Sequence, residues 1–302
     1  MKKIAITTTS FCEYDKNPLS LLIKHGLEIV INPYKRKLNR EEVVELSKDA
    51  VGIIAGTEPL NAYVLERLTG VKVISRCGVG MDNVDMDVAK RLGIKVYNTP
   101  DAPTLAVAEL TVGLMLNLLR KVSQMDRDIR LGSWRKKMGN LLYKKNVGIL
   151  GFGHIGKKVS ELLKPFTCNI AYVDPAVEND FGGFKRLSIT EMLEWADIVS
   201  IHVSSRNKII GHEEFRLFKK GAWLINVSRG EVVDEECLYE CLQDGTLSGA
   251  ALDVFESEPY DGTLKKLDNV ILTSHIGSYA KESRVEMEMQ SAINLLQGLE
   301  LQ

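Results

Sequence analysis

The sequence predicts an α/β protein with two doubly wound parallel-sheet domains. The first hundred residues alternate short apolar runs with helical patterns, which is typical of a parallel sheet covered by helices. Two prolines and Asp101 then break the pattern at residues 98–103, and the same alternation restarts at Asn146. The break therefore indicates a crossing between two separate α/β units.

Short apolar runs mark the strands of the first unit. They lie at residues 4–8, 28–31, 51–56, 72–77 and 95–98. Two helices between them have readable starts. Asn39 is followed by Glu42 at the spacing of a capping box, and Asn61 precedes a helix at 62–68.

An apolar helix at 105–120 and a polar, basic stretch up to Lys145 follow the crossing. Strands are then expected at 147–150, 169–174, 197–203, 222–227, 247–254 and 269–274. Helices are expected at 155–163, at 188–196 behind a Ser188–Glu191 capping box, and at 234–243. The final segment reads as one amphipathic helix, whose partner surface the periodicity does not identify.

Composition excludes several classes of protein. The 302 residues are 45% hydrophobic and 26% charged, which excludes a disordered or fibrous chain. Lys and Arg number 39 against 40 Asp and Glu, so no global positive field favours nucleic acid or anionic membrane. The N-terminus has no apolar signal region, and Glu109 interrupts the longest apolar stretch. We expect a cytosolic protein without nucleic-acid or membrane partners.

The five cysteines are scattered and form no CxxC pair or His/Cys cluster. We therefore expect reduced thiols and no metal site.

A glycine motif points to a dinucleotide cofactor. The sequence NVGILGFGHIG leads an apolar strand into Gly151, Gly153 and Gly156 at GxGxxG spacing, with a helix following. The glycines allow a tight turn, a close approach of the pyrophosphate and close helix packing. Asp174 ends the next strand, where its carboxylate can bind the ribose hydroxyls and repel a 2′-phosphate. This arrangement favours NAD over NADP.

Three side chains suit acid–base chemistry beside such a cofactor. His275 follows the last strand, Arg229 ends another, and Glu258 follows a third. An arginine can bind a carboxylate substrate with two hydrogen bonds, and a glutamate beside a histidine fixes its tautomer. Taken singly, each of these residues is equally well explained as an ordinary surface charge.

The ordered segments GFGHIG, NVSRGEVVDE, ALDVFESEP and LTSHIG, with Asp174 among them, resemble the D-isomer-specific 2-hydroxyacid dehydrogenases, the phosphoglycerate dehydrogenase type especially. ISRCGVGMDNVD at 74–85 resembles that family's substrate loop. YNTPDAPTLAVAEL at 97–110 resembles its interdomain crossing. The resemblance covers nearly the whole chain.

The resemblance implies a catalytic set of Arg229, Glu258 and His275. His275 would take the proton from the substrate hydroxyl as hydride leaves for the nicotinamide, and Glu258 would orient His275. Arg229, together with backbone N–H groups of Gly78, Val79 and Gly80, would hold the substrate carboxylate.

The resemblance also implies cofactor contacts beyond the glycine motif. By position these are Val79, His154, Ile155, Asp174, Val203, Val227, Asp253 and the 275–278 turn, which includes Ser278. A Rossmann NAD-binding domain at 99–279 and a smaller flavodoxin-like substrate domain at 1–98 and 280–302 are implied, as is a homodimer formed through the NAD-binding domain.

The substrate is less well defined than the reaction. The turn AGTEP has Gly56 where phosphoglycerate dehydrogenases commonly have an arginine, whereas the basic run at 134–137 resembles a segment that those enzymes place near the substrate. 3-Phosphoglycerate is therefore the favoured substrate. The alternatives are another 2-keto acid of the glyoxylate or hydroxypyruvate type, phosphite, and a role as an NAD(H)-sensing interaction protein.

Three further features depart from the family's usual pattern. Ser274 replaces the proline before the catalytic histidine, and the 202–211 segment is shorter than usual, which bears on the Val203 contact. The chain ends at Gln302, so we expect no C-terminal regulatory domain.

Overall fold

The chain folds into two compact units, and after the second unit it returns to the first. A computed structural model describes residues 1–177 and 182–301. The first unit consists of Met1–Pro103 and Ser278–Gln302, and the second of Thr104–Gly277. These crossings lie a few residues from the expected positions at 98/99 and 279/280.

The first unit is built on a parallel sheet of five strands in the order β2-β1-β3-β4-β5. The strands are β1 (Lys2–Ile6), β2 (Leu27–Ile31), β3 (Gly52–Ala55), β4 (Val73–Arg76) and β5 (Lys95–Tyr97). This is the flavodoxin-like order, with its switch point between β1 and β3. The first strand ends at Ile6, earlier than expected. The hydroxyl of Thr7 then donates to Glu58, and that of Thr8 accepts from Arg284.

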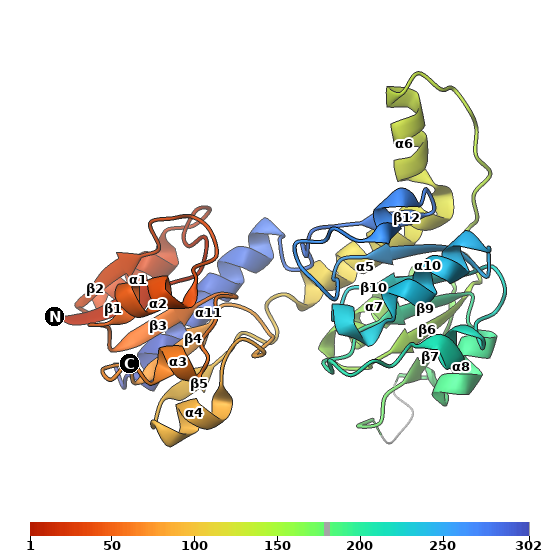
Figure 1. Ribbon diagram of the computed structural model, residues 1–302. Coiled ribbons are helices and arrows are strands. Elements are labelled where there is room, and N and C mark those ends of the chain that lie inside the picture. The colour runs from red at the N-terminus through yellow and green to blue at the C-terminus, as the bar shows by residue number, and fades with distance from the viewer. Residues whose placement is uncertain (178–181, 302) are drawn as a thin grey trace. The chain divides into compact units, whose positions relative to one another are not determined.

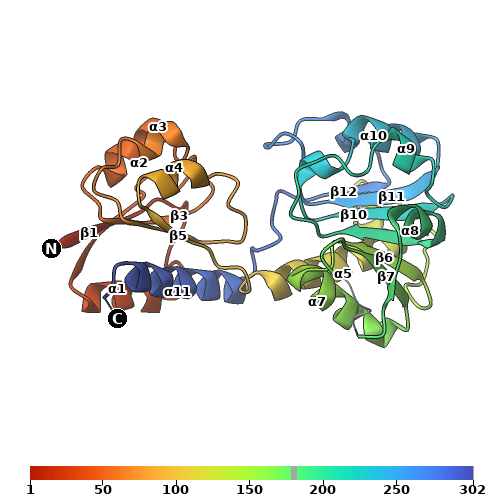
Figure 2. The same cartoon turned by 90° about the horizontal axis from the view of Figure 1, so that it is seen from below.

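Helices cover both faces of this sheet (Figure 2). One face carries α2 (Arg40–Ser47), α3 (Ala62–Leu65) and α4 (Met86–Arg91), and the other carries α1 (Asn17–Lys24) and α11 (Lys281–Gly298). The unit is therefore doubly wound, and its second face is completed by the C-terminal helix.

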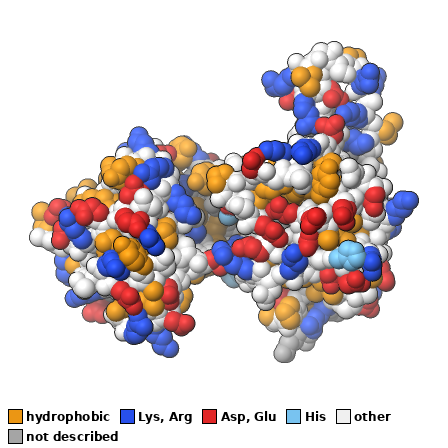
Figure 3. Space-filling view, viewed as in Figure 1, with side chains coloured by type: hydrophobic (Ala, Val, Ile, Leu, Met, Phe, Trp, Pro, Cys, Tyr) orange, Lys and Arg blue, Asp and Glu red, His pale blue; other side chains and the backbone are white. Residues whose placement is uncertain are grey.

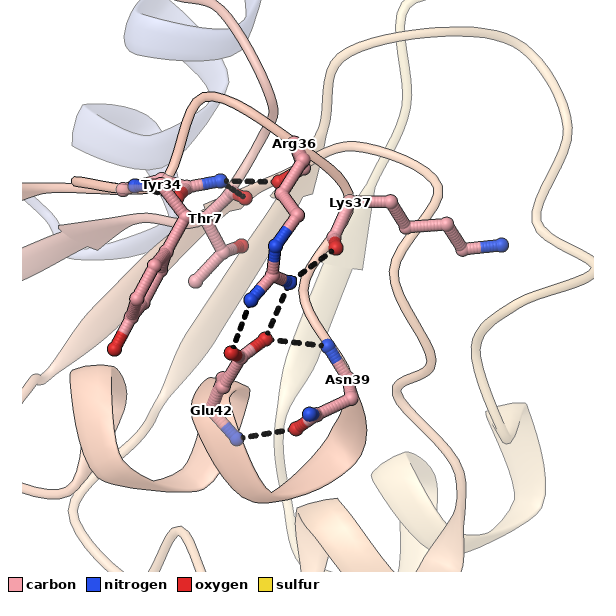
Figure 4. Close-up of polar contacts among 7 residues, drawn as sticks. Thr7, Tyr34, Arg36, Lys37, Asn39 and Glu42 are labelled. Atoms are coloured by element: carbon pink, nitrogen blue, oxygen red, sulfur yellow. Dashed lines mark hydrogen bonds and ion pairs between the residues drawn. The ribbon is translucent and has the colours of Figure 1, made fainter.

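The expected capping box at the start of α2 is confirmed. Glu42 N–H donates to Asn39 Oδ1 at 2.9 Å, and Asn39 N–H donates to Glu42 Oε2 at 3.0 Å (Figure 4). Arg36 adds two hydrogen bonds to the same carboxylate, at 2.8 and 2.6 Å. The Arg36 guanidinium lowers the pKa of Glu42 to about 2, so this cap is charged at neutral pH.

The second unit is built on seven parallel strands in the order β12-β11-β10-β9-β6-β7-β8. The strands are β6 (Asn146–Leu150), β7 (Asn169–Val173), β8 (Lys185–Arg186), β9 (Ile198–Ile201), β10 (Ala222–Asn226), β11 (Leu247–Leu252) and β12 (Val270–Leu272). This is the Rossmann order with one more strand at the β11 edge. The two-residue β8 was not expected, because it is too short to show an apolar pattern.

Helices also cover both faces of the second sheet. One face carries α5 (Thr104–Arg120) and α7 (His154–Leu163), and the other carries α8 (Ile189–Trp195), α9 (His212–Phe215) and α10 (Glu235–Gln243). The polar stretch after α5 contains an unexpected helix, α6 (Val122–Arg130), which projects from the body of this unit (Figure 1). Within the described ranges, no helix is both long and apolar enough to cross a membrane.

The C-terminal helix α11 packs closely on the first sheet. Leu295 is fully buried, and a Cβ atom at Gly52 of β3 would lie only 2.8 Å from Leu295 Cδ1. A Cβ atom at Gly298 would lie 2.6 Å from Val73 of β4. Glycine at these two positions allows helix and sheet to approach this closely.

We predict that Leu295→Ala lowers the free energy of unfolding of the first unit by about 2–5 kcal/mol, because it leaves a cavity under α11. Urea unfolding followed by far-UV circular dichroism measures the loss. Ile293→Ala is the matched control, since Ile293 lies on the same helix and is 38% exposed. Equal stability of the two variants would contradict the packing described.

Candidate active site

The carboxyl ends of all strands of the second sheet lie at one edge, since the strands are parallel. The sheet order reverses between β6 and β9, and the glycine loop follows β6 there. Asp174 follows β7, Arg229 follows β10, Asp253 follows β11 and His275 follows β12. The expected site residues of this unit thus share one edge of one sheet.

The glycine loop has the three properties that a pyrophosphate site needs. Gly151 has φ +92°, and a Cβ there would lie 2.7 Å from His202 backbone atoms. A Cβ at Gly156 would lie 2.2 Å from the carbonyl oxygen of Gly151, so helix α7 and the loop require a glycine there. A Cβ at Gly153 would meet nothing within 4 Å, which leaves open space beside the N-terminus of α7. His154 and Ile155 form the first turn of that helix.

Asp174 is tied to the glycine loop by its carboxylate. Oδ2 accepts from Phe152 N–H at 2.7 Å, and Oδ1 accepts from Ala176 N–H at 2.8 Å. Each oxygen keeps a second lone pair, which can accept from a ribose hydroxyl. The fixed negative charge opposes a 2′-phosphate, so these residues fit NAD.

Two expected cofactor contacts and one histidine lie at the same edge. Val203 follows β9, and its backbone nitrogen would lie 2.8 Å from a Cβ at Gly151; Val227 follows β10 and is buried. His202 bonds Ser200 Oγ through Nε2 at 2.8 Å. Burial lowers the pKa of His202 to about 3, so it is neutral at physiological pH and forms part of the packing.

His275 and Glu258 form a hydrogen-bonded pair. His275 Nδ1 lies 2.9 Å from Glu258 Oε2, although 17 residues separate the two in the chain. The other oxygen, Oε1, accepts from Phe255 N–H at 3.2 Å. The His275 and Glu258 side chains are 53% and 38% exposed, so Nε2 of His275 can meet a substrate. This arrangement is that of a general acid–base with an orienting carboxylate.

Asp253 anchors the turn that carries His275. It is 1% exposed, and its Oδ1 accepts from Thr273 Oγ1 at 2.6 Å and from Ile276 N–H at 2.8 Å. Its Oδ2 accepts from Gly277 N–H at 2.8 Å. These bonds hold the backbone on both sides of His275, whose φ is +56°. The sequence interpretation gave Asp253 only a cofactor contact and missed this anchoring.

Asn226 shapes the turn that carries Arg229, and the sequence interpretation gave it no role. Its amide donates to the carbonyl of Arg229 at 2.9 Å, and its Oδ1 accepts from the backbone and hydroxyl of Ser228 at 3.1 and 2.9 Å. A Cβ at Gly230 would lie 1.9 Å from Phe255, so this turn packs directly on the loop that carries Glu258. The sequence did contain a signal for this role, because Asn226 is a polar residue at the end of the otherwise apolar strand AWLIN.

The remaining expected site residues belong to the first unit. Gly78 follows β4 with φ +143°, and its N–H already donates to Thr99 Oγ1 at 2.8 Å. In this structure that hydrogen bond anchors the loop that carries Gly78. Across the described residues, the N–H groups of Val79 and Gly80 have no protein acceptor. Ser278 is half-buried at the start of the returning segment.

Comparison with known proteins gives a family model for the second unit. Residues 112–277 match the model described as "D-isomer specific 2-hydroxyacid dehydrogenase, NAD binding domain". The second unit is thus similar to an NAD-binding domain, which is the kind of domain that the glycine loop and Asp174 indicate.

Individual relatives are similar over most of the chain. A D-3-phosphoglycerate dehydrogenase of Methanocaldococcus jannaschii is 40% identical over 82% of this chain, and the chain spans about half (49%) of that relative's length. A glyoxylate reductase of Thermofilum pendens is 37% identical over 91% of this chain and 86% of its own length. The NAD⁺-bound 3-phosphoglycerate dehydrogenase of Entamoeba histolytica superposes with a TM-score of 0.84 at 26% identity, covering 99% of this chain and 95% of its own.

We predict that Asp253→Asn lowers the free energy of unfolding of the second unit by about 1–3 kcal/mol, because an amide NH₂ group replaces an oxygen that faces buried donors. Tryptophan fluorescence during urea unfolding measures the loss, since Trp134, Trp195 and Trp223 all belong to this unit. Asp261→Asn is the control, because Asp261 is 89% exposed. A loss no larger than that of the control would argue against the anchoring role.

Proposed function

Because the chain belongs to the D-isomer specific 2-hydroxyacid dehydrogenase family, we propose that it catalyses NAD-dependent hydride transfer between a D-2-hydroxy acid and the corresponding 2-keto acid. The observation that carries the proposal is the 2.9 Å contact between His275 and Glu258. This contact lies at the same sheet edge as a glycine loop that fits the pyrophosphate of NAD.

His275 is assigned the proton transfer. Its Nδ1 is held by Glu258, so Nε2 is the nitrogen that exchanges a proton with the substrate oxygen. Bound NAD supplies the hydride acceptor, or as NADH the donor. During oxidation His275 becomes an imidazolium, whose charge the Glu258 carboxylate stabilises, and during reduction it returns the proton.

Arg229 is assigned the substrate carboxylate, which a guanidinium binds with two parallel hydrogen bonds. Asn226 fixes the turn that presents Arg229, and Nη1 of Arg229 donates to the Ser228 carbonyl at 2.8 Å. The N–H groups of Val79 and Gly80 are proposed as further donors to the substrate. Val79, His154, Ile155, Val203, Val227 and Ser278 are proposed as cofactor contacts.

Two substrate classes are each supported by an observation. 3-Phosphoglycerate is supported by the name of the Methanocaldococcus relative and by the exposed Arg135 and Lys136. Lys137 of the same basic run forms an ion pair with Asp128 at 2.8 Å.

An unphosphorylated acid of the glyoxylate or hydroxypyruvate type is supported by the turn after β3. A Cβ at Gly56 would lie 2.8 Å from Thr8 Oγ1, and the buried carboxylate of Glu58 accepts from Gly56 N–H. This turn therefore offers a phosphate no cation.

We predict that the purified protein oxidises NADH in the presence of a 2-keto acid, measured by NADH absorbance with glyoxylate, hydroxypyruvate and 3-phosphohydroxypyruvate. His275→Gln should lower kcat/KM by about 10²–10⁴-fold, because the proton donor is lost. His212→Gln is the matched control, since His212 is exposed in the same unit. Tight NADH binding without turnover would contradict the proposal and favour an NAD(H)-sensing role.

We further propose a homodimer formed through the second unit. Helix α6 and the segment after it expose large apolar side chains, which a dimer would cover. They are Val122, Ile129, Leu131, Trp134, Met138, Leu141 and Tyr143. Figure 3 shows orange and blue side chains together on this projecting part.

We predict a mass near twice 33.7 kDa in sedimentation velocity. The double substitution Trp134→Ser with Met138→Ser should shift the protein toward the monomer, because both side chains are more than four-fifths exposed, at 83% and 89%. Tyr34→Ser is the control, as an exposed apolar residue of the first unit. A monomeric parent protein would refute the dimer.

A further inference from the structure

Glu258 lies on an irregular loop and is not part of any helix or strand. Residues 256–258 are exposed, so burial does not fix their positions. The contact of Phe255 N–H with Glu258 Oε1 is internal to the loop. The position of Glu258 therefore depends on contacts that tie this loop to the body of the second unit.

One side chain from outside the loop accepts a hydrogen bond from its backbone. Glu235, the first residue of α10, accepts from Glu256 N–H through Oε1 at 2.9 Å. The neighbouring acidic residues have other roles. Asp234 caps the helix and pairs with Lys208 at 2.6 Å, and Glu236 is exposed.

The surroundings of Glu235 show that this contact compensates for burial. Burial raises the pKa of Glu235, the charges of Glu256 and Asp234 raise it further, and the Glu256 N–H opposes the shift. Lys208 lies 3.9 Å from the Glu256 carboxylate and is the cation beside this cluster. The hydrogen bond from Glu256 N–H therefore holds the partly buried Glu235 carboxylate in a defined position.

Glu235 also connects the two loops of the site. The segment from Arg229 leads through the turn Gly230–Val232 directly into α10, and Gly230 packs on Phe255 and Glu256. The hydrogen bond from Glu256 N–H to Glu235 closes this contact from the helix side. The Arg229 turn and the Glu258 loop are thus fixed to each other through one short segment.

We infer that Glu235 is a positioning residue for the His275–Glu258 pair: its carboxylate holds the Glu258 loop so that Glu258 Oε2 meets His275 Nδ1 at 2.9 Å. The inference rests on the proposed function, in which this pair transfers the proton. Because misplacement of a catalytic group by about 1 Å costs about 10²-fold in rate, a single anchoring hydrogen bond is enough to matter.

The test compares Glu235→Ala, Glu235→Gln and Glu236→Ala in the full chain. Glu235→Ala should lower kcat for keto-acid reduction by about 10- to 100-fold and leave NADH affinity within about twofold. Glu235→Gln should restore kcat to within about threefold, since an amide oxygen still accepts from Glu256 N–H. Glu236→Ala should match the parent protein.

An unchanged kcat in Glu235→Ala would overturn the inference. So would a lower kcat that Glu235→Gln does not restore, because that pattern indicates only general destabilisation.

A second measurement does not depend on turnover. The ¹H–¹⁵N signals of the His275 ring should change in Glu235→Ala and remain parental in Glu235→Gln. If the parent protein reduces no 2-keto acid, the proposed function fails while this spectrum still decides the positioning role.

Discussion

The parallel direction of all seven strands in the second unit is the constraint on which the site depends. Because every strand ends at the same edge, residues far apart in the chain are delivered to one place. The reversal of strand order between β6 and β9 leaves the N-terminus of α7 open beside the glycine loop. If one of these strands ran in the opposite direction, the residue that follows it would lie at the opposite edge.

The strands bring the loops to this edge, and buried or partly buried polar side chains then fix their conformations. Asp253 holds the His275 turn, Asn226 holds the Arg229 turn, and Glu235 holds the Glu258 loop. Each of these groups has a backbone partner, as buried polar groups require. The groups proposed to react, His275 and Glu258, are in contrast partly exposed and open to a substrate.

Sequence reasoning predicted the two α/β units, the capping boxes at Asn39 and Ser188, and the family, because these depend on local periodicity and on motifs. It missed α6, a short helix in a stretch that was interpreted only as polar and basic, and β8, which is too short to show a pattern. It also missed the anchoring contacts of Asp253 and Asn226. Such contacts depend on which loops lie side by side, and spacing along the chain does not encode that.

In the proposed mechanism, Glu258 acts through His275 on the proton transfer and does not contribute to cofactor binding. Single-turnover hydride transfer by Glu258→Gln, started by mixing NADH-loaded protein with saturating 2-keto acid, measures this role. We expect parental NADH affinity on the same sample and a hydride step slower by at least about tenfold, since the imidazolium loses its carboxylate. An unchanged hydride step, or a loss confined to NADH affinity, would exclude this role for Glu258.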